Sequence, residues 1–81
     1  MENRVAVISI IVEDEAAVNA LNALLHEYGQ NIIGRLGIPY RTKGINIICI
    51  AIDAPQDRID ALMSALEALK GIEARAVCSR A

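Results

Sequence analysis

The stretch INIICIAI, residues 45–52, decides the fold, because seven of its eight residues are apolar. A strand whose two alternating sets of side chains are both apolar is buried on both faces of a sheet. The segment RVAVISIIV, residues 4–12, has the same character. The sequence therefore predicts two strands in the middle of one sheet, with apolar side chains directed to both of its faces.

The segments around these two strands complete a chain order of strand, helix, strand, strand, helix, strand. The other expected elements are a helix from the acidic triplet at 13–15 to Gly29, a strand at 32–40, a turn at 41–44 in which Gly44 takes a positive φ, a helix with Pro55 as its first residue that runs to Gly71, and a strand at 72–79. This order predicts one α+β domain, residues 1–81, with the ferredoxin-like βαββαβ fold. In that fold the antiparallel sheet has the strand order 4-1-3-2, with two helices on one face.

The fold leaves one face of the sheet without helices, although the central strands are apolar on both faces. The two alternating sets are Ala6, Ile8, Ile10 and Val12 against Val5, Val7 and Ile11 in the first strand, and Ile48, Ile50 and Ile52 against Ile45, Ile47, Cys49 and Ala51 in the third. An uncovered aliphatic face of this size is an aggregation hazard. We therefore expect a homo-oligomer, a dimer or a tetramer, that buries this face or continues the sheet edge to edge.

Composition and missing functional groups exclude several classes of protein. A pI near 5.2 argues against direct nucleic-acid binding. The N-terminus does not resemble a secretion signal, and no apolar run approaches the length of a membrane span, so a cytoplasmic location is expected. The loop after the first strand, VEDEAA, has neither a glycine-rich phosphate cradle nor a C-x-x-C pair. We expect no catalytic residue, no metal site and no cofactor, and therefore no enzyme.

The two cysteines, Cys49 and Cys78, are expected to stay reduced in the cytoplasm. The predicted sheet order places one strand between them, so their Cα atoms should lie about 10 Å apart, beyond the reach of a disulfide. No disulfide is therefore predicted within one subunit.

The stretch NIIGRLGIPYRTKG, residues 31–44, is the candidate binding site. Its glycines would let a ligand approach the backbone, and its basic side chains could hold an anion. We expect a small anionic metabolite at Arg35, Gly37, Tyr40 and Arg41, near a subunit boundary. The alternative interpretation is an edge strand that its proline, glycines and charges protect from unwanted pairing.

The element Arg35-Leu36-Gly37-Ile38-Pro39, set between VISIIVED and INIICIAI and followed by GIEARAV, resembles the iron-only hydrogenase system regulator family over essentially the whole chain. The resemblance implies an ACT-like ferredoxin fold and a cytosolic regulatory role linked to iron-only hydrogenase. The chain lacks the glycine that amino-acid-sensing ACT domains have after the first strand. It also lacks the several histidines of the related nickel-responsive domain, since His26 is its only one.

The sequence and the resemblance together favour a regulatory module that senses a small ligand or interacts with a protein of the hydrogenase system. The alternative is a structural adaptor that docks a maturation or transcription partner without a small ligand.

Overall fold

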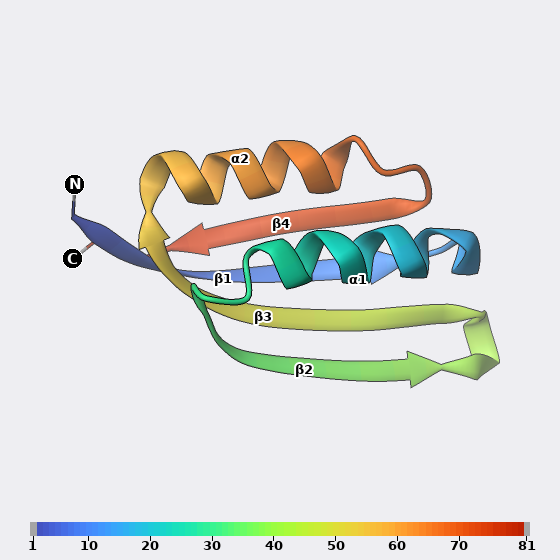
Figure 1. The fold of residues 1–81 in the computed structure, drawn as a ribbon. Helices are drawn as coiled ribbons and strands as arrows, with labels where there is room; N and C mark the ends of the chain where they lie inside the picture. Colours follow the sequence, from blue (N-terminus) through green and yellow to red (C-terminus); the bar gives the residue numbers. More distant parts are fainter. Residues whose placement is uncertain (1, 81) are drawn as a thin grey trace.

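The structure, a computed structural model, describes residues 2–80. Its elements are β1 (Asn3–Val12), a 3-10 turn η1 (Glu15–Ala17), α1 (Val18–Glu27), β2 (Ile32–Tyr40), a 3-10 turn η2 (Arg41–Lys43), β3 (Ile45–Pro55), α2 (Gln56–Glu67) and β4 (Ile72–Cys78). The four strands form one sheet in the order β2-β3-β1-β4, and all neighbouring strands are antiparallel (Figure 1). The predicted fold and strand order are confirmed.

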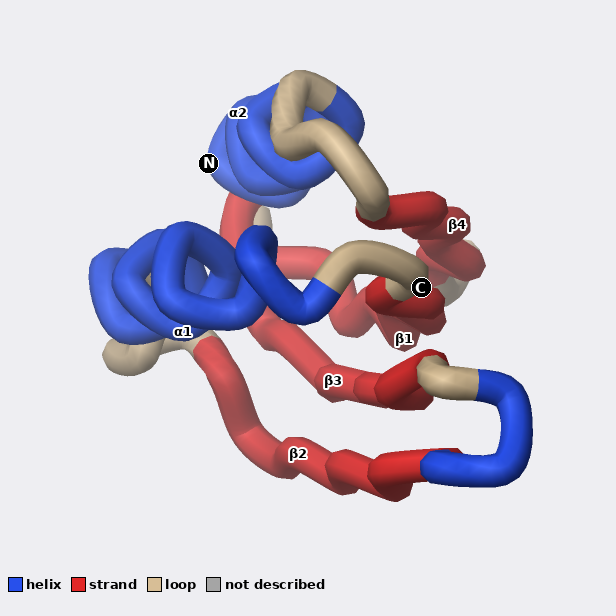
Figure 2. Tube along the Cα trace, turned by 90° about the vertical axis from the view of Figure 1, so that its right-hand side faces the viewer, coloured by secondary structure: helices blue, strands red, loops and turns tan. Residues whose placement is uncertain are grey.

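Both helices lie on the same side of the sheet, as Figure 2 shows most clearly. The core fills the space between the helices and the sheet, and every residue in it is aliphatic. Its members are Ala6, Ile8, Ile10, Val12, Ala17, Leu21, Leu25, Ile48, Ile50, Ile52, Ala54, Ile59, Leu62, Leu66 and Ala74. The structure thus shows which alternating set meets the helices: Ala6, Ile8, Ile10 and Val12 in β1, and Ile48, Ile50 and Ile52 in β3.

The two helices begin later than the sequence pattern predicted. Asp14 caps the first one, because its side chain accepts a hydrogen bond of 3.0 Å from the backbone N–H of Ala16. A 3-10 turn then leads into α1 at Val18. The prediction that Pro55 is the first helical residue is wrong. Pro55 ends β3 with an extended ψ of 149° and stands at the N-cap position of α2.

The turn between α2 and β4 packs against the loop that follows β1. Gly71 has a φ of +83°, a backbone conformation that favours glycine. A Cβ atom added at Gly71 would lie 2.4 Å from the Cβ of Asp14. The Gly71 carbonyl oxygen also accepts a hydrogen bond of 2.8 Å from the Glu13 N–H. This glycine therefore permits both the turn and the close approach.

None of the helices within residues 2–80 is long and apolar enough to cross a membrane.

Candidate functional site

The side of the sheet opposite the helices, here called the open face, carries large apolar side chains that are exposed. The strand registers place the side chains of Val7, Ala51 and Val77 side by side on it, and those of Ile11, Ile47 and Ile38 in a second row. Several are large and exposed, with Val77 at 74%, Leu36 at 57% and Val7 at 47%.

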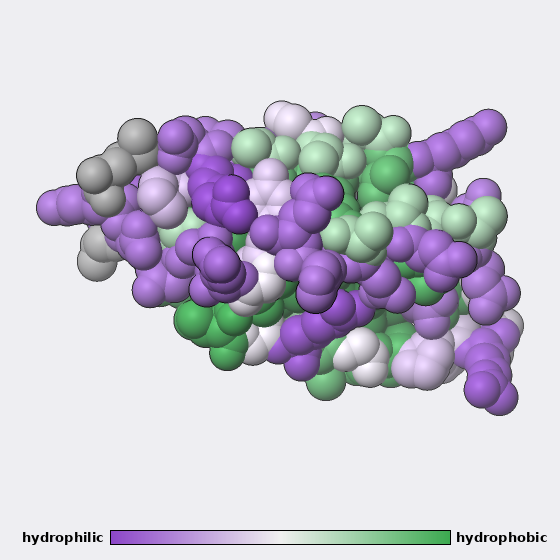
Figure 3. Space-filling model, in the orientation of Figure 1, coloured by the Kyte–Doolittle hydropathy of each residue, from purple (hydrophilic) through white to green (hydrophobic). Residues whose placement is uncertain are grey.

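Within residues 2–80, no helix covers the open face. By contrast, hydrophilic side chains interrupt the apolar patches on the helix-covered side (Figure 3).

Polar groups on the open face lie mainly along β4. Glu73 and Arg75 are exposed there, and with Ser9 and Ile11 they line a shallow depression of about 270 Å³. At the centre of the face the Ser9 hydroxyl and the Cys49 thiol are 3.9 Å apart. The face is thus an aliphatic surface bounded on one side by a pair of opposite charges.

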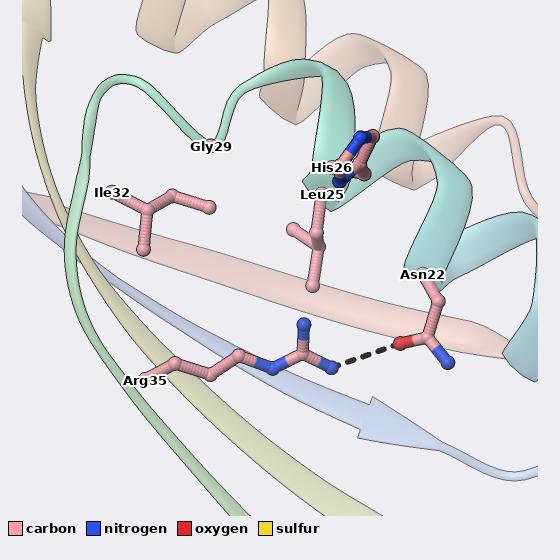
Figure 4. Close-up of a pocket in the computed structure, with 6 residues that line it drawn as sticks. All are labelled: Asn22, Leu25, His26, Gly29, Ile32 and Arg35. Carbon is pink, nitrogen blue, oxygen red and sulfur yellow. Dashed lines mark hydrogen bonds between the residues drawn. The ribbon is translucent and has the colours of Figure 1, made fainter.

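A second candidate site is a depression of about 290 Å³ between α1 and β2. Register places Arg35 on the helix side of β2, opposite Ile50. Its Nη2 donates a hydrogen bond of 2.8 Å to the Asn22 Oδ1 on α1. Figure 4 shows the guanidinium at the edge of the depression, with the Leu25 and Ile32 side chains pointing into it. The arrangement combines a cation, an amide and an apolar floor.

A third depression, also about 290 Å³, lies beside η2 and includes Tyr40 and Arg41. Glu15 lines the same depression, so an acidic residue and the basic Arg41 lie on its wall together. Gly44 closes the turn with a φ of +66°, as predicted from the sequence.

The structure divides the four residues of the predicted ligand site into two groups. Arg35 and Gly37 lie opposite helix-facing core residues of β3, whereas Tyr40 and Arg41 line the depression at η2. The contact between Arg35 and Asn22 could not be predicted from the sequence, because Asn22 is exposed on α1 and distant along the chain from Arg35.

Within residues 2–80, no three metal-ligating side chains gather in one place. Cys49 pairs in register with Ser9 on the open face, and Cys78 pairs with Ala6 on the helix side. The two free thiols therefore point to opposite faces of the sheet.

Comparison with protein families gives a match over residues 4–76 to the TM1266-like family, described as "Iron-only hydrogenase system regulator, putative". The chain belongs to this family. Among solved structures, the uncharacterized protein TM1266 from Thermotoga maritima is similar at a TM-score of 0.93 and 30% identity, covering 98% of this chain and 100% of that chain. The recognition made from the sequence is confirmed.

More distant structures place this chain among ACT-like folds. The ACT domain from GTP pyrophosphokinase of Chlorobium tepidum has a TM-score of 0.78 at 20% identity and covers 93% of this chain and 99% of that one. CPII, a nitrogen regulatory PII-like protein from Thiomonas intermedia K12 bound to ADP, AMP and bicarbonate, has a TM-score of 0.56 at 17% identity, covering 98% and 99% of the two chains. The comparison with curated protein sequences found no match.

Proposed function

We propose that this protein is a non-enzymatic cytoplasmic regulatory module of the iron-only hydrogenase system that works as a homo-oligomer and senses a small anionic metabolite. The observation that carries the proposal is the open face of the sheet. Contiguous apolar patches above a few hundred Å² are rare on soluble monomers and mark interaction sites. Here the apolar side chains come from all four strands, so a second copy is the occupant that matches them best.

The oligomer is tested by placing a charge in the middle of the open face. Val7→Lys should shift the mass measured by sedimentation equilibrium towards the monomer, because burying an unpaired ammonium costs several kcal/mol. Ala23→Lys, at an exposed position on α1, is the matched control and should leave the mass unchanged. A wild-type protein that is monomeric at micromolar concentration would refute the oligomer.

The ligand part of the proposal depends on Arg35. A guanidinium has five N–H donors, and within residues 2–80 Arg35 makes one hydrogen bond, to Asn22. The remaining donors can bind a carboxylate or phosphate as a fork, while the half-buried Ile32 contacts an apolar part of the same molecule. CPII shows that a protein of this general fold can hold small anions.

Thermal-shift screening of carboxylates and phosphates, followed by titration calorimetry of any hit, tests the ligand site. Arg35→Ala should weaken binding by roughly tenfold to a hundredfold, as expected for a lost charged hydrogen bond. Arg41→Ala is the matched control, since Arg41 belongs to the depression at η2. A hit that Arg41→Ala weakens and Arg35→Ala does not would move the site to Tyr40 and Arg41.

The second candidate function is the adaptor that docks a hydrogenase maturation or transcription protein. The same open face favours it, because an apolar surface can bind an unrelated chain as well as a copy. Stoichiometric capture of one protein from an anaerobic lysate, abolished by Val7→Lys and accompanied by no small-molecule stabilisation, would replace the sensor with the adaptor.

A further inference from the structure

The two edges of the sheet differ in whether another strand can pair with them. The β2 edge contains Gly34, Gly37 and Pro39, and its register shifts between Ile32 and Gly34. These are devices that discourage strand addition. The β4 edge, Ile72–Cys78, contains neither glycine nor proline and keeps one register along its whole pairing with β1. Strand β4 is therefore the edge open to pairing.

The hydrogen bonds to β1 show which backbone groups point away from the sheet at β4. The Ser79 N–H donates to the Val5 carbonyl at 2.7 Å, and the Glu13 N–H donates to the Gly71 carbonyl at 2.8 Å. In an antiparallel ladder, alternate residues direct both backbone groups to the same neighbour. The odd-numbered residues of β4 thus bond to β1, and Ile72, Ala74 and Ala76 direct their N–H and C=O groups to the free edge.

We propose that two copies of this chain pair antiparallel through β4, with Ala74 opposite the partner subunit's Ala74. This deepens the homo-oligomer proposed above and rests on it. Glu73 then lies opposite the partner subunit's Arg75, and the two-fold axis repeats the pair. Both residues are exposed on the open face, on either side of Ala74. Pairing would add about six backbone hydrogen bonds and two cross-strand ion pairs.

The charges of Glu73 and Arg75 favour this register over the registers shifted by two residues. The backbone phase allows shifts that move one strand by two residues along the other. A shift in one direction places Glu73 opposite the partner subunit's Glu73, and a shift in the other places Arg75 opposite the partner subunit's Arg75. Like charges directly opposite each other destabilise a strand pair. The Glu-Ala-Arg order is therefore self-complementary in one register and repulsive in the two beside it.

In the single chain, the Arg75 side chain partly occupies this edge. Its Nη1 donates a hydrogen bond of 3.0 Å to the Ala74 carbonyl oxygen, an acceptor that the partner strand would use. In the proposed pair, the Ala74 carbonyl oxygen would instead accept from a backbone N–H of the partner strand. The Arg75 guanidinium would face the carboxylate of the partner subunit's Glu73. The exchange replaces an intramolecular bond with two intermolecular ones.

Charge reversal tests the pairing. Glu73→Arg and Arg75→Glu should each weaken the β4-paired dimer by at least about fivefold, since each turns two attractions into two repulsions. The double variant E73R/R75E restores the opposite charges and should recover the wild-type dissociation constant. Lys43→Glu is the matched control, because Lys43 lies in the turn after β2, the edge strand on the opposite side of the sheet from β4. Equal association of all four variants would overturn β4 pairing and leave the oligomer through the open face standing.

Disulfide crosslinking tests the register of the proposed β4 pairing directly. In a background without Cys49 and Cys78, a mixture of Glu73→Cys and Arg75→Cys chains should oxidise to a mixed disulfide dimer, because directly opposite Cβ atoms lie about 4.5–5.5 Å apart. Each variant alone should remain largely uncrosslinked. A Glu73→Cys chain that crosslinks to itself as fast as the mixture, or a mixture that gives no dimer, would overturn the proposed register.

Discussion

Replacing Gly71 by alanine tests the contact between the α2–β4 turn and the loop that follows β1. Gly44→Ala provides an internal reference. Both glycines have positive φ, +83° at Gly71 and +66° at Gly44. An alanine in this region costs about 1–2 kcal/mol. At Gly44 nothing lies within 4 Å of the new methyl group, so we expect that loss alone.

At Gly71 the methyl group also meets Asp14. Its position is 2.4 Å from the Asp14 Cβ and 3.3 Å from the Asp14 backbone nitrogen, so the loop must move. Forced displacement of packed atoms costs about 1–3 kcal/mol. The expected total for Gly71→Ala is about 2–5 kcal/mol, against about 4–12 kcal/mol for a whole domain of 81 residues.

The measurement is urea unfolding followed by circular dichroism, with all proteins at one concentration because assembly stabilises the folded chain. Gly71→Ala should lose at least about 1 kcal/mol more than Gly44→Ala. Equal losses at the two sites would show that the Asp14 contact costs nothing and that the backbone conformation explains both effects.

Three further changes in unfolding free energy follow from the packing. Leu62→Ala should cost about 2–5 kcal/mol because the side chain is fully buried between sheet and helix, and a loss below about 1 kcal/mol would contradict its place in the core. Asp14→Ala should cost about 1 kcal/mol through the lost cap, whereas Asp14→Asn keeps an acceptor and should lose much less. Arg58→Ala should cost about 1 kcal/mol, because the guanidinium lies 4.5 Å from the centre of the Tyr28 ring and donates to Asn31 at 2.7 Å. The unfolding free energy of Arg58→Lys should lie between those of the wild type and Arg58→Ala, since lysine keeps the charge and loses the planar fork.

The fold could be predicted because hydrophobic pattern and strand position agree along the chain. The central strands are aliphatic on both alternating sets, whereas the edge strand β2 carries glycines, a proline and Arg35, and the edge strand β4 carries Glu73 and Arg75. The end of β3 could not be predicted in the same way. Asp53 and Ala54 continue the strand through pairing with β1, a contact between distant segments that residue type alone does not encode.

The candidate site was harder to predict from the sequence, because adjacent residues on a strand point to opposite faces. Arg35 and Arg41 stand close together in the chain, which suggested one anion clamp. The structure directs Arg35 to α1 and places Arg41 in the turn beyond Tyr40. Which face a strand residue takes depends on register, and the irregularity between Ile32 and Gly34 sets that register in β2.

The unequal edges of the sheet also decide how large an assembly can become. Joining two chains through β4 consumes both of the permissive edges and leaves a β2 strand at each outer end. Pro39 has no N–H to offer a newcomer, and the irregular start of β2 breaks the ladder beside it. In the proposed β4-paired dimer, growth of the sheet would therefore stop at two chains and would not continue into filaments, even though each chain carries a long aliphatic surface.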